Sequence, residues 1–337
     1  STLFPYTTLF RSTQSYSLLI VLGLVIFYNT AFSTSEDITD VKSTFLINAG
    51  KELFFSKELS YDSQVACSSC HIPEKGFQDG YERALIRGKV LSRNTLSILN
   101  VNRYLNYFWD GRAVSLEKQI EGPLFQKIEI GSSKEIINKL VFSNTLLFNA
   151  FNLSKAENTQ AFVISALKAY CIDVSTKTTR YNQFLDGNIS FTNQELSGME
   201  LFFGKANCSN CHSLPNFTDG KFHKVNKYRR KIILQSPGNS TNVSDLKLGY
   251  DYGRGNVENG RDALFAFRTP SLFNVSITSP YMHDGSHRTL DEVIDYYNRG
   301  GDIKTGPLYR LGLTNKEKKQ IISFLLTLSD SNYIKSQ

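Results

Sequence analysis

Two copies of one short pattern hold the residues of this chain best suited to chemistry. Residues 67–71 read CSSCH and residues 208–212 read CSNCH. The spacing Cys-x-x-Cys-His is typical of covalent c-type haem attachment, in which two thiols form thioethers and the histidine ligates the iron. With five cysteines and five histidines in 337 residues, chance does not account for two complete copies. The sequence therefore predicts two covalently bound haem c groups, held by Cys67, Cys70, His71, Cys208, Cys211 and His212.

The composition fits a globular chain with room for two domains. Hydrophobic residues make up 41%, which is enough for real cores, and the net charge is +7. The densest basic run, residues 227–231, is interpreted as a solvated loop, with a role in docking an acidic redox partner as the alternative. Nothing in the charge pattern indicates nucleic-acid binding. The fifth cysteine, Cys171, lies in an apolar helical pattern and is expected to be a buried free thiol.

Residues 1–33 are interpreted as a leader. Residues 17–28 form an almost wholly apolar run that is too short for a comfortable membrane span, and small residues suited to signal cleavage follow at 30–33. A secretory signal peptide is the first interpretation, and an uncleaved membrane anchor is the second. Residues 1–12 begin without Met and match nothing downstream, so a non-native origin is one interpretation of that stretch.

Hydrophobic spacing predicts a mainly α-helical fold with long loops. Two features lie outside the helical stretches, a glycine-rich loop at 72–94 and an insertion at 224–260 with little periodicity. A further helix is expected to begin at Ser115, and Thr192 with Glu195 forms a plausible capping box. The expected helical stretches cover residues 43–56, 134–149 and 158–173, and a later stretch from 192 leads into the second haem motif.

The stretch before each haem motif is repeated. Residues 50–55 read GKELFF and residues 198–203 read GMELFF, each a short distance before a Cys-x-x-Cys-His. This internal repeat predicts two related, cytochrome c-like haem domains. We place the N-terminal domain at 40–187 and the C-terminal domain at 188–333.

Beyond the haem motifs, the chain resembles the bacterial di-haem cytochrome c peroxidases and their relative MauG. The resemblance covers about residues 43–330. It rests on four local texts in order, FWDGRA at 108–113, SLEKQ at 115–119 followed by Gly122 and Pro123, RTPSL at 268–272, and PYMHDG at 280–285. It implies reduction of hydrogen peroxide to water by two electrons, with one haem cleaving peroxide and the other receiving electrons.

The resemblance makes the N-terminal haem, ligated by His71, the peroxide site. In many family members a histidine from the following loop caps this iron, but this chain has no histidine between His71 and His212. An open iron is therefore expected. Gln119 and Glu129 match the distal glutamine and glutamate of the family, whereas without the resemblance they would be taken for solvated polar groups. The local text QKIEI differs from the frequent NPVEM, so the loop is expected to differ in shape.

Trp109, the only tryptophan, matches the residue that lies between the haems in the family and would relay electrons; core packing is the alternative. For the C-terminal haem, ligated by His212, the family's methionine ligand is replaced by Tyr297, as in MauG. Tyr296 facing the haem, or Met282 as ligand, are the alternatives. His283 would hydrogen-bond a haem propionate. The resemblance also implies a calcium ion between the domains, held by the Asn94 side chain and the carbonyls of Thr278 and Pro280.

Three functions follow from these expectations. The first is a periplasmic di-haem peroxidase that takes electrons from a small cytochrome c or cupredoxin. The second is a MauG-like oxidase that makes a protein-derived cofactor through high-valent iron. The third is a non-catalytic di-haem electron carrier, which has no need of a distal acid/base pair such as Gln119 and Glu129. A homodimer is known in the family, but no sequence feature identifies a dimer face.

Overall fold

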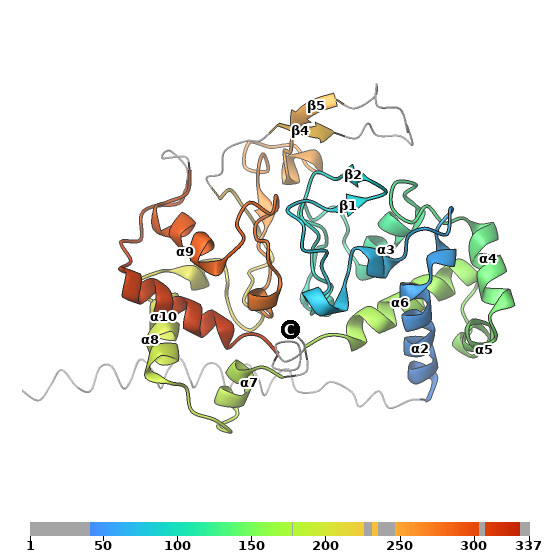
Figure 1. The fold of residues 1–337 in the computed structure, drawn as a ribbon, viewed down its shortest axis with the longest axis horizontal. Coiled ribbons are helices and arrows are strands. Elements are labelled where there is room, and N and C mark those ends of the chain that lie inside the picture. The colour runs from blue at the N-terminus through green and yellow to red at the C-terminus, as the bar shows by residue number, and fades with distance from the viewer. Residues whose placement is uncertain (1–40, 177, 226–230, 235–246, 303–306, 331–337) are drawn as a thin grey trace, which may run out of the picture.

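The computed structural model describes residues 41–176, 178–225, 231–234, 247–302 and 307–330, and they form two helical lobes with long loops between them (Figure 1). Helices α2 to α6 build the N-terminal lobe and α8 to α10 the C-terminal lobe. Their bounds are α2 Val41–Phe55, α3 Leu116–Phe125, α4 Lys134–Ser143, α5 Thr145–Ser154, α6 Thr159–Asp173, α7 Arg180–Leu185, α8 Asn193–Phe203, α9 Leu290–Asn298 and α10 Asn315–Leu326.

The described strands are short and occur in antiparallel pairs. They are β1 Leu85–Ile86 with β2 Lys89–Val90, β3 Phe222–His223 with β6 Phe267–Arg268, and β4 Lys231–Leu234 with β5 Lys247–Tyr250. The first pair lies in the predicted loop 72–94, and the β4–β5 pair lies in the predicted insertion. Both segments therefore carry some regular structure that their sequence periodicity does not indicate.

Polar side chains cap the first turns of most helices. Each cap accepts a hydrogen bond from a backbone N–H two or three residues into the helix, which satisfies a donor that the helix itself leaves unpaired. Thr192 and Glu195 form the predicted capping box of α8. Asn144 caps α5 by accepting from Leu147 N at 3.1 Å, so the expected single stretch 134–149 is in fact two helices. The capping residues are Ser115, Ser133, Asn144, Asn158, Thr179, Thr192, Thr289 and Thr314.

The two repeated glycines have one structural role. A Cβ at Gly50 would lie 1.9 Å from the Ala166 carbonyl oxygen, and a Cβ at Gly198 would lie 1.9 Å from the Gln320 carbonyl oxygen. Helix α2 therefore crosses α6, and α8 crosses α10, with backbone against backbone. Each crossing joins the helix before a haem motif to the last long helix of its lobe. The sequence repeat thus reflects a repeated fold.

Two separate apolar cores accompany the two crossings. The N-terminal core is centred on Leu53, Phe54 and Phe162, and the C-terminal core on Phe202, Phe217 and Phe324. Helix α7 belongs to the second core, because Tyr181 packs edge-on against Phe217 at 5.1 Å and its N–H donates to the Thr327 carbonyl. This packing places the division between the lobes in the segment between α6 and α7, ahead of the predicted boundary near 187.

A second repeat becomes visible only in the structure. Residues 93–101 (RNTLSILNV) and 268–275 (RTPSLFNV) follow the same path, each ending in a left-handed asparagine before a short 3₁₀ turn. The amide nitrogens of Asn100 and Asn274 both donate to the Thr176 hydroxyl in the connection between the lobes. The loops 107–113 and 281–287 also correspond, since each is closed by one bridge between its end residues. The similarity between the lobes therefore extends along the chain as far as the helices that follow these loops, α3 and α9.

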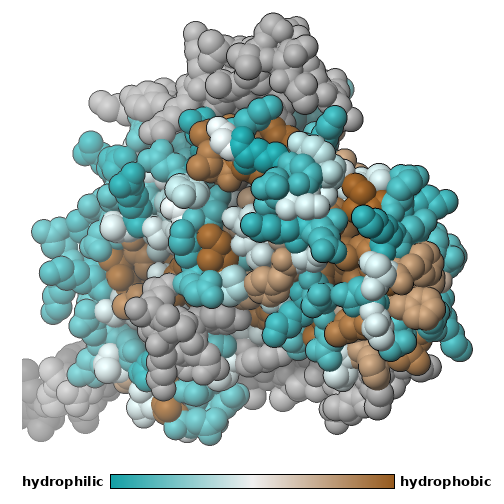
Figure 2. Space-filling model, turned by 45° about the vertical axis from the view of Figure 1, so that its right-hand side comes forward, coloured by the Kyte–Doolittle hydropathy of each residue, from teal (hydrophilic) through white to brown (hydrophobic). Residues whose placement is uncertain are grey.

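The surface carries one notable group of apolar side chains. Figure 2 shows a mainly hydrophilic face, with apolar side chains gathered toward the side of the N-terminal lobe. The α4–α5 hairpin contributes Phe142, Leu146, Phe148 and Leu153 to the exposed large hydrophobic residues. Among the described residues, no helix is both long and apolar enough to cross a membrane. The predicted leader, residues 1–33, lies outside the described ranges.

The glycine crossings give a first prediction. Replacing Gly50 or Gly198 by alanine pushes two helices apart, so each variant should lower the free energy of unfolding by at least about 2 kcal/mol, in the range of overpacked cores. Urea unfolding followed by far-ultraviolet circular dichroism measures this. Asn48→Ala, on the exposed side of α2, is the matched control and should be near neutral. Wild-type stability in Gly50→Ala would contradict the backbone crossing.

Candidate functional site

The first haem motif folds as a tight turn that presents its histidine. Residues 67–69 form a 3₁₀ turn, and the His71 N–H donates to the Cys67 carbonyl at 3.0 Å. The His71 Nδ1 lies 3.1 Å from the Phe77 carbonyl oxygen. Burial lowers the pKa of His71, so its imidazole is neutral near pH 7. With Nδ1 donating to a carbonyl, Nε2 is the atom left to ligate iron.

The second motif repeats this arrangement. The His212 N–H donates to the Cys208 carbonyl at 2.9 Å, and Nδ1 lies 3.1 Å from the Phe217 carbonyl oxygen. Phe217 and its counterpart Phe77 both adopt left-handed backbones, with φ of 51° and 58°. Such a conformation is unfavourable for a bulky residue and persists where its surroundings hold it. Both phenylalanines thus aim a carbonyl at a haem-ligating imidazole, a role that sequence reasoning missed.

The four motif cysteines suit thioether formation. None is in a disulfide. Burial raises the pKa of Cys67 and Cys70 to about 12, so both remain protonated thiols rather than reactive thiolates. Burial likewise raises the pKa of Cys208 to about 12. Cys171 is buried as expected, and the pKa of its thiol is also raised by burial. The residues present therefore fit two covalent haem c groups.

Gln119 and Glu129, the residues expected on the distal side of the first haem, come from α3 and from the loop that follows it. Burial raises the pKa of Glu129, and the positive charge of Arg112 opposes that effect. Burial is the main cause of the raised pKa of Cys67 and Cys70, and Glu129 adds to it, so Glu129 lies within electrostatic range of both thiols. Gln119 is on α3, and its Oε1 is buried without a hydrogen-bond partner in the described structure. A buried acceptor of this kind fits a site that receives a ligand.

The loop that carries Glu129 is held by an arginine that the sequence did not point to. Arg87 NH1 donates to the carbonyls of Ile128, at 2.9 Å, and Glu129. The same guanidinium pairs with Asp62 through two nitrogens, at 2.8 and 2.9 Å, and the hydrogen bond from Arg87 keeps the pKa of Asp62 well below its usual range. This fork-to-carboxylate pair fixes the direction of the guanidinium. Arg87 therefore sets the backbone position of the distal loop.

Trp109 lies between the two halves of the molecule. Its side chain is buried, and the indole Nε1 donates to the Asn94 carbonyl at 2.9 Å. Its own carbonyl accepts from the Arg268 N–H at 2.8 Å, from the other half of the chain. Asn94 N in turn donates to the His283 carbonyl at 2.8 Å. Trp109 is therefore an interface residue that is hydrogen-bonded to both copies of the second repeat, residues 93–101 and residues 268–275.

The structure separates the two adjacent tyrosines of α9. The pKa of Tyr297 is raised by burial first and also by its nearness to Cys211 and Cys208 of the second haem motif. Tyr296 is fully buried on another side of the helix, and its hydroxyl donates to the Val225 carbonyl. Of these two tyrosines, Tyr297 is therefore the one in position to approach the C-terminal haem.

The corresponding helix in the N-terminal lobe offers no such ligand. Helix α3 follows the cap Ser115 as α9 follows the cap Thr289, and counting along both helices pairs Pro123 with Tyr297. Proline has no side-chain atom that can bind iron. The two halves thus differ at one equivalent position, where one has a phenol and the other a closed aliphatic ring. The open N-terminal iron stays a prediction, and Pro123 is the position at which it is tested below.

The residues expected to bind calcium lie in the interdomain contact. Asn94 is buried, and its amide nitrogen donates to the Tyr81 carbonyl at 2.9 Å, which leaves the amide oxygen as its ligating atom. Gln78 donates to the carbonyl of Ser279, the residue between Thr278 and Pro280. These bonds bring the two segments to one place, and oxygen donors of this type suit Ca²⁺.

His283 packs in the same contact. Its ring stacks on Phe267, with centroids 3.6 Å apart and an angle of 12° between the planes. The expected hydrogen bond from His283 to a haem propionate stays a prediction.

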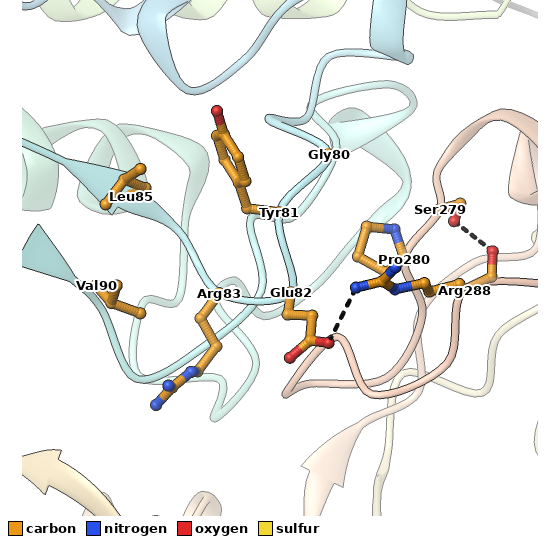
Figure 3. A pocket seen from close by; sticks show the side chains of 9 residues that line it. All are labelled: Gly80, Tyr81, Glu82, Arg83, Leu85, Val90, Ser279, Pro280 and Arg288. Atoms are coloured by element: carbon orange, nitrogen blue, oxygen red, sulfur yellow. Dashed lines mark hydrogen bonds and ion pairs between the residues drawn. The ribbon is translucent and has the colours of Figure 1, made fainter. Parts of the chain in front are cut away.

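A cavity of about 510 Å³ opens at the edge of this contact (Figure 3). One wall comes from the loop that contains Tyr81, Glu82 and Arg83, and the other from Ser279, Pro280 and Arg288. The Glu82 carboxylate and the Arg288 guanidinium reach toward each other across it, at 3.6 Å. Both side chains are exposed, so this pair contributes little to stability.

Similarity to known proteins agrees with the geometry. Residues 46–190 match the family model of the di-haem cytochrome c peroxidases. The chain is 32% identical over 290 residues to the methylamine utilization protein MauG of Methylorubrum extorquens, an alignment that covers 83% of this chain and 76% of that protein. The chain belongs to the di-haem cytochrome c peroxidase and MauG family.

Two further family members, a peroxidase and a MauG-like protein, are similar to most of this chain. The cytochrome-c peroxidase IdrP2 of Denitromonas iodatirespirans is 30% identical over 302 residues, covering 84% of this chain and 81% of that protein. The crystal structure of a MauG-like protein associated with microbial copper homeostasis superposes with a TM-score of 0.73 at 30% identity, covering 86% of this chain and 91% of that one. A peroxidase and a MauG are thus similar to this chain to nearly the same degree. Family membership supports an oxidoreductase with haem c and the mainly helical fold.

The separation of the two tyrosines gives a second prediction for this family member. If Tyr297 ligates the C-terminal iron, Tyr297→Phe should change the low-spin haem spectrum, since the replacement has no phenol oxygen. Tyr296→Phe is the matched control, because its ring has the same size but its hydroxyl bonds a carbonyl. Optical and electron paramagnetic resonance spectra of the ferric proteins provide the measurement. An unchanged spectrum in Tyr297→Phe would remove Tyr297 as ligand.

Proposed function

We propose that this protein reduces hydrogen peroxide to water with electrons from a small redox protein, a cytochrome c or a cupredoxin. The observation that carries the proposal is Glu129, a partly buried carboxyl whose pKa is raised by burial and which lies within electrostatic range of Cys67 and Cys70. Peroxide cleavage needs a group that takes a proton from one oxygen and returns it to the other, and a carboxyl with a raised pKa suits both steps near neutral pH. A simple electron carrier has no use for such a group.

The protein residues would divide the work on peroxide. The haem held by His71 supplies the binding and reduction of peroxide. Glu129 accepts the proton of the bound peroxide and delivers it to the departing oxygen, so that two electrons and two protons convert one peroxide to two waters. Gln119, whose buried Oε1 has no hydrogen-bond partner in the described structure, would position peroxide for proton transfer with Glu129. Trp109, hydrogen-bonded to both halves, would pass electrons on from the haem that His212 would hold.

A second function is supported by Tyr297. In this alternative the protein is a MauG-like oxidase that uses the same two haems to modify a partner protein. A phenol as distal ligand favours ferric iron, which suits an oxidising role better than electron entry at high potential. The identity to MauG is also as high as the identity to a peroxidase. The third alternative, a non-catalytic carrier, leaves Glu129 and Gln119 unexplained.

The proposed setting is the periplasm. The leader at residues 1–33 and the two covalent haem motifs both support export, with an uncleaved membrane anchor as the second possibility. The Ca²⁺ site at Asn94, Thr278 and Pro280 is proposed as part of the interdomain contact, and a homodimer as the assembly.

The role of Glu129 gives a third prediction. Glu129→Gln should lower kcat/KM for peroxide by about 10² to 10⁴-fold, the usual contribution of general acid/base catalysis. In the wild-type protein the rate should rise with pH as the carboxyl loses its proton. The midpoint of that rise lies above the ordinary 4.5, because burial raises the pKa of Glu129. Steady-state turnover with reduced cytochrome c, measured across pH, is the experiment.

Controls make this result specific. Glu157→Gln alters an exposed glutamate in the loop before α6 and should leave both rate and pH profile unchanged. A wild-type rate or an unaltered pH profile in Glu129→Gln would remove Glu129 from proton transfer. Turnover by neither protein, with a Tyr297-dependent oxidation of a partner protein instead, would favour the MauG-like alternative.

The Pro123 position gives a fourth prediction. If the N-terminal iron is open, the ferric protein as isolated should show a high-spin signal and bind cyanide before any reduction. Electron paramagnetic resonance and a cyanide titration followed in the Soret band measure this. A fully low-spin protein that binds cyanide only after reduction would mean that another side chain caps the iron.

A further inference from the structure

The loop around Trp109 is bonded to the C-terminal half through four consecutive carbonyl groups. Arg268 donates from Nε to the Phe108 carbonyl at 3.2 Å and from its backbone N–H to the Trp109 carbonyl at 2.8 Å. Arg254 NH1 donates to the carbonyls of Asp110 at 3.1 Å and Gly111 at 3.0 Å. Each of these four backbone acceptors receives a hydrogen bond from the other half, which fixes this loop more firmly than side-chain packing alone.

Arg254 belongs to a short segment, residues 251–258, that follows strand β5 below the β4–β5 pair (Figure 1). Its guanidinium lies over the Phe222 ring, 4.5 Å from the centroid, and NH2 pairs with Glu258 at 2.8 Å. Gly111 is pressed against the same ring, because a Cβ there would lie 2.2 Å from Phe222 Cζ. Packing against Phe222 therefore holds both Arg254 and Gly111 in place, in addition to the hydrogen bond between them.

The beginning of the segment is bonded to the other side of the same loop. Asp251 forms two hydrogen bonds with Arg93, at 2.6 and 2.7 Å. Arg93 also pairs with Asp110, the residue after Trp109, at 2.8 Å. The side chains of Arg93, Asp110 and Asp251 are each no more than 14% exposed. Removing one member of a buried charge group leaves the others uncompensated, so this group resists displacement.

The N-terminal lobe has no counterpart of this segment. The loop 281–287 corresponds to 107–113, and its His283 carbonyl accepts from Asn94 N, as the Trp109 carbonyl accepts from Arg268 N. Arg254, however, comes from the region 224–260, which has no equivalent in the first repeat. This region adds a contact to the tryptophan side of the interface. Of the two corresponding loops, 107–113 is the one that receives the contact from Arg254. This asymmetry indicates that the contact serves the position of Trp109 in particular.

We propose that residues 251–258 form a strap that fixes Trp109 between the two haem motifs, with Arg254 as its positioning residue. The strap acts through the carbonyls of Asp110 and Gly111 and, by way of Arg93, through the Asp110 side chain. It does not touch the reacting groups. Its effect on electron transfer rests on the proposed function, in which Trp109 carries electrons. Its effect on the position of the indole is independent of that function.

The position of the indole can be measured directly, because Trp109 is the only tryptophan. Energy transfer to the haems shortens its emission lifetime in a distance-dependent way. In the haem-loaded protein, Arg254→Gln should give a longer and more heterogeneous lifetime, and Arg254→Lys, which keeps the charge and one donor, should recover part of the change. Arg310→Gln, at an exposed arginine elsewhere, is the control. An unchanged lifetime in Arg254→Gln overturns the strap.

A double-mutant cycle tests what the strap does. Electron transfer between the haems is followed by stopped-flow absorbance after mixing the half-reduced protein with peroxide. Arg254→Gln should slow this step about tenfold, within the ~10²-fold that a misplacement of ~1 Å can cost. In a Trp109→Phe background the same change should have little further effect, since residues that act through one another are not additive.

The outcomes separate the two proposals. Equal slowing in both backgrounds means that Arg254 acts on the whole fold, and it overturns the positioning role. If Arg254→Gln alters the lifetime but neither it nor Trp109→Phe alters the transfer rate, the strap is retained. In that case the relay role of Trp109 in the proposed function is overturned.

Discussion

The structure depends on two places where helices touch backbone to backbone. At Gly50 and Gly198 any side chain would collide with a carbonyl of the crossing helix, so the helix before each haem motif lies directly on the last long helix of its lobe. Since each haem motif follows its crossing within a short loop, the crossing sets where Cys67 and Cys208 lie. From there the tight turns deliver His71 and His212, each held by a left-handed phenylalanine carbonyl.

The internal repeat gives each lobe the same helix crossing and the same haem-motif turn. A few differences in side chains make the two lobes unequal. Equivalent positions hold Pro123 and Tyr297, and the corresponding loops hold Trp109 and His283. Where the two halves share the same backbone path, side chains at equivalent positions can differ while the helices and haem-motif turns stay alike. The proposed difference between the haems, an open iron and a covered one, needs only such changes of side chain.

The parts predicted from sequence are those with a local signal. The helices, the caps at Ser115 and Thr192, the haem motifs and the repeat around Gly50 and Gly198 all follow from spacing along the chain. What escaped prediction depends on distant partners or on backbone geometry. Asn144 divides a continuous apolar pattern because its side chain caps α5, and the carbonyl of Phe77 acts through the backbone, which residue identity does not reveal. Arg87 and Arg254 act on loops far away in sequence.

The buried charges at the interface explain how two similar lobes keep one arrangement. Burial alone would lower the pKa of Arg93, but Asp251 and Asp110 outweigh it and raise the pKa, so the guanidinium stays charged inside the contact. Such a group adds little net stability, because desolvation offsets the attraction, whereas losing one partner costs about 3–5 kcal/mol. The buried charges therefore favour one arrangement of the two lobes over others, and they add little to the free energy of unfolding. An arrangement that matches Arg93 with both carboxylates is strongly preferred over any shifted one, and Trp109 directly precedes one of them, Asp110, in the chain.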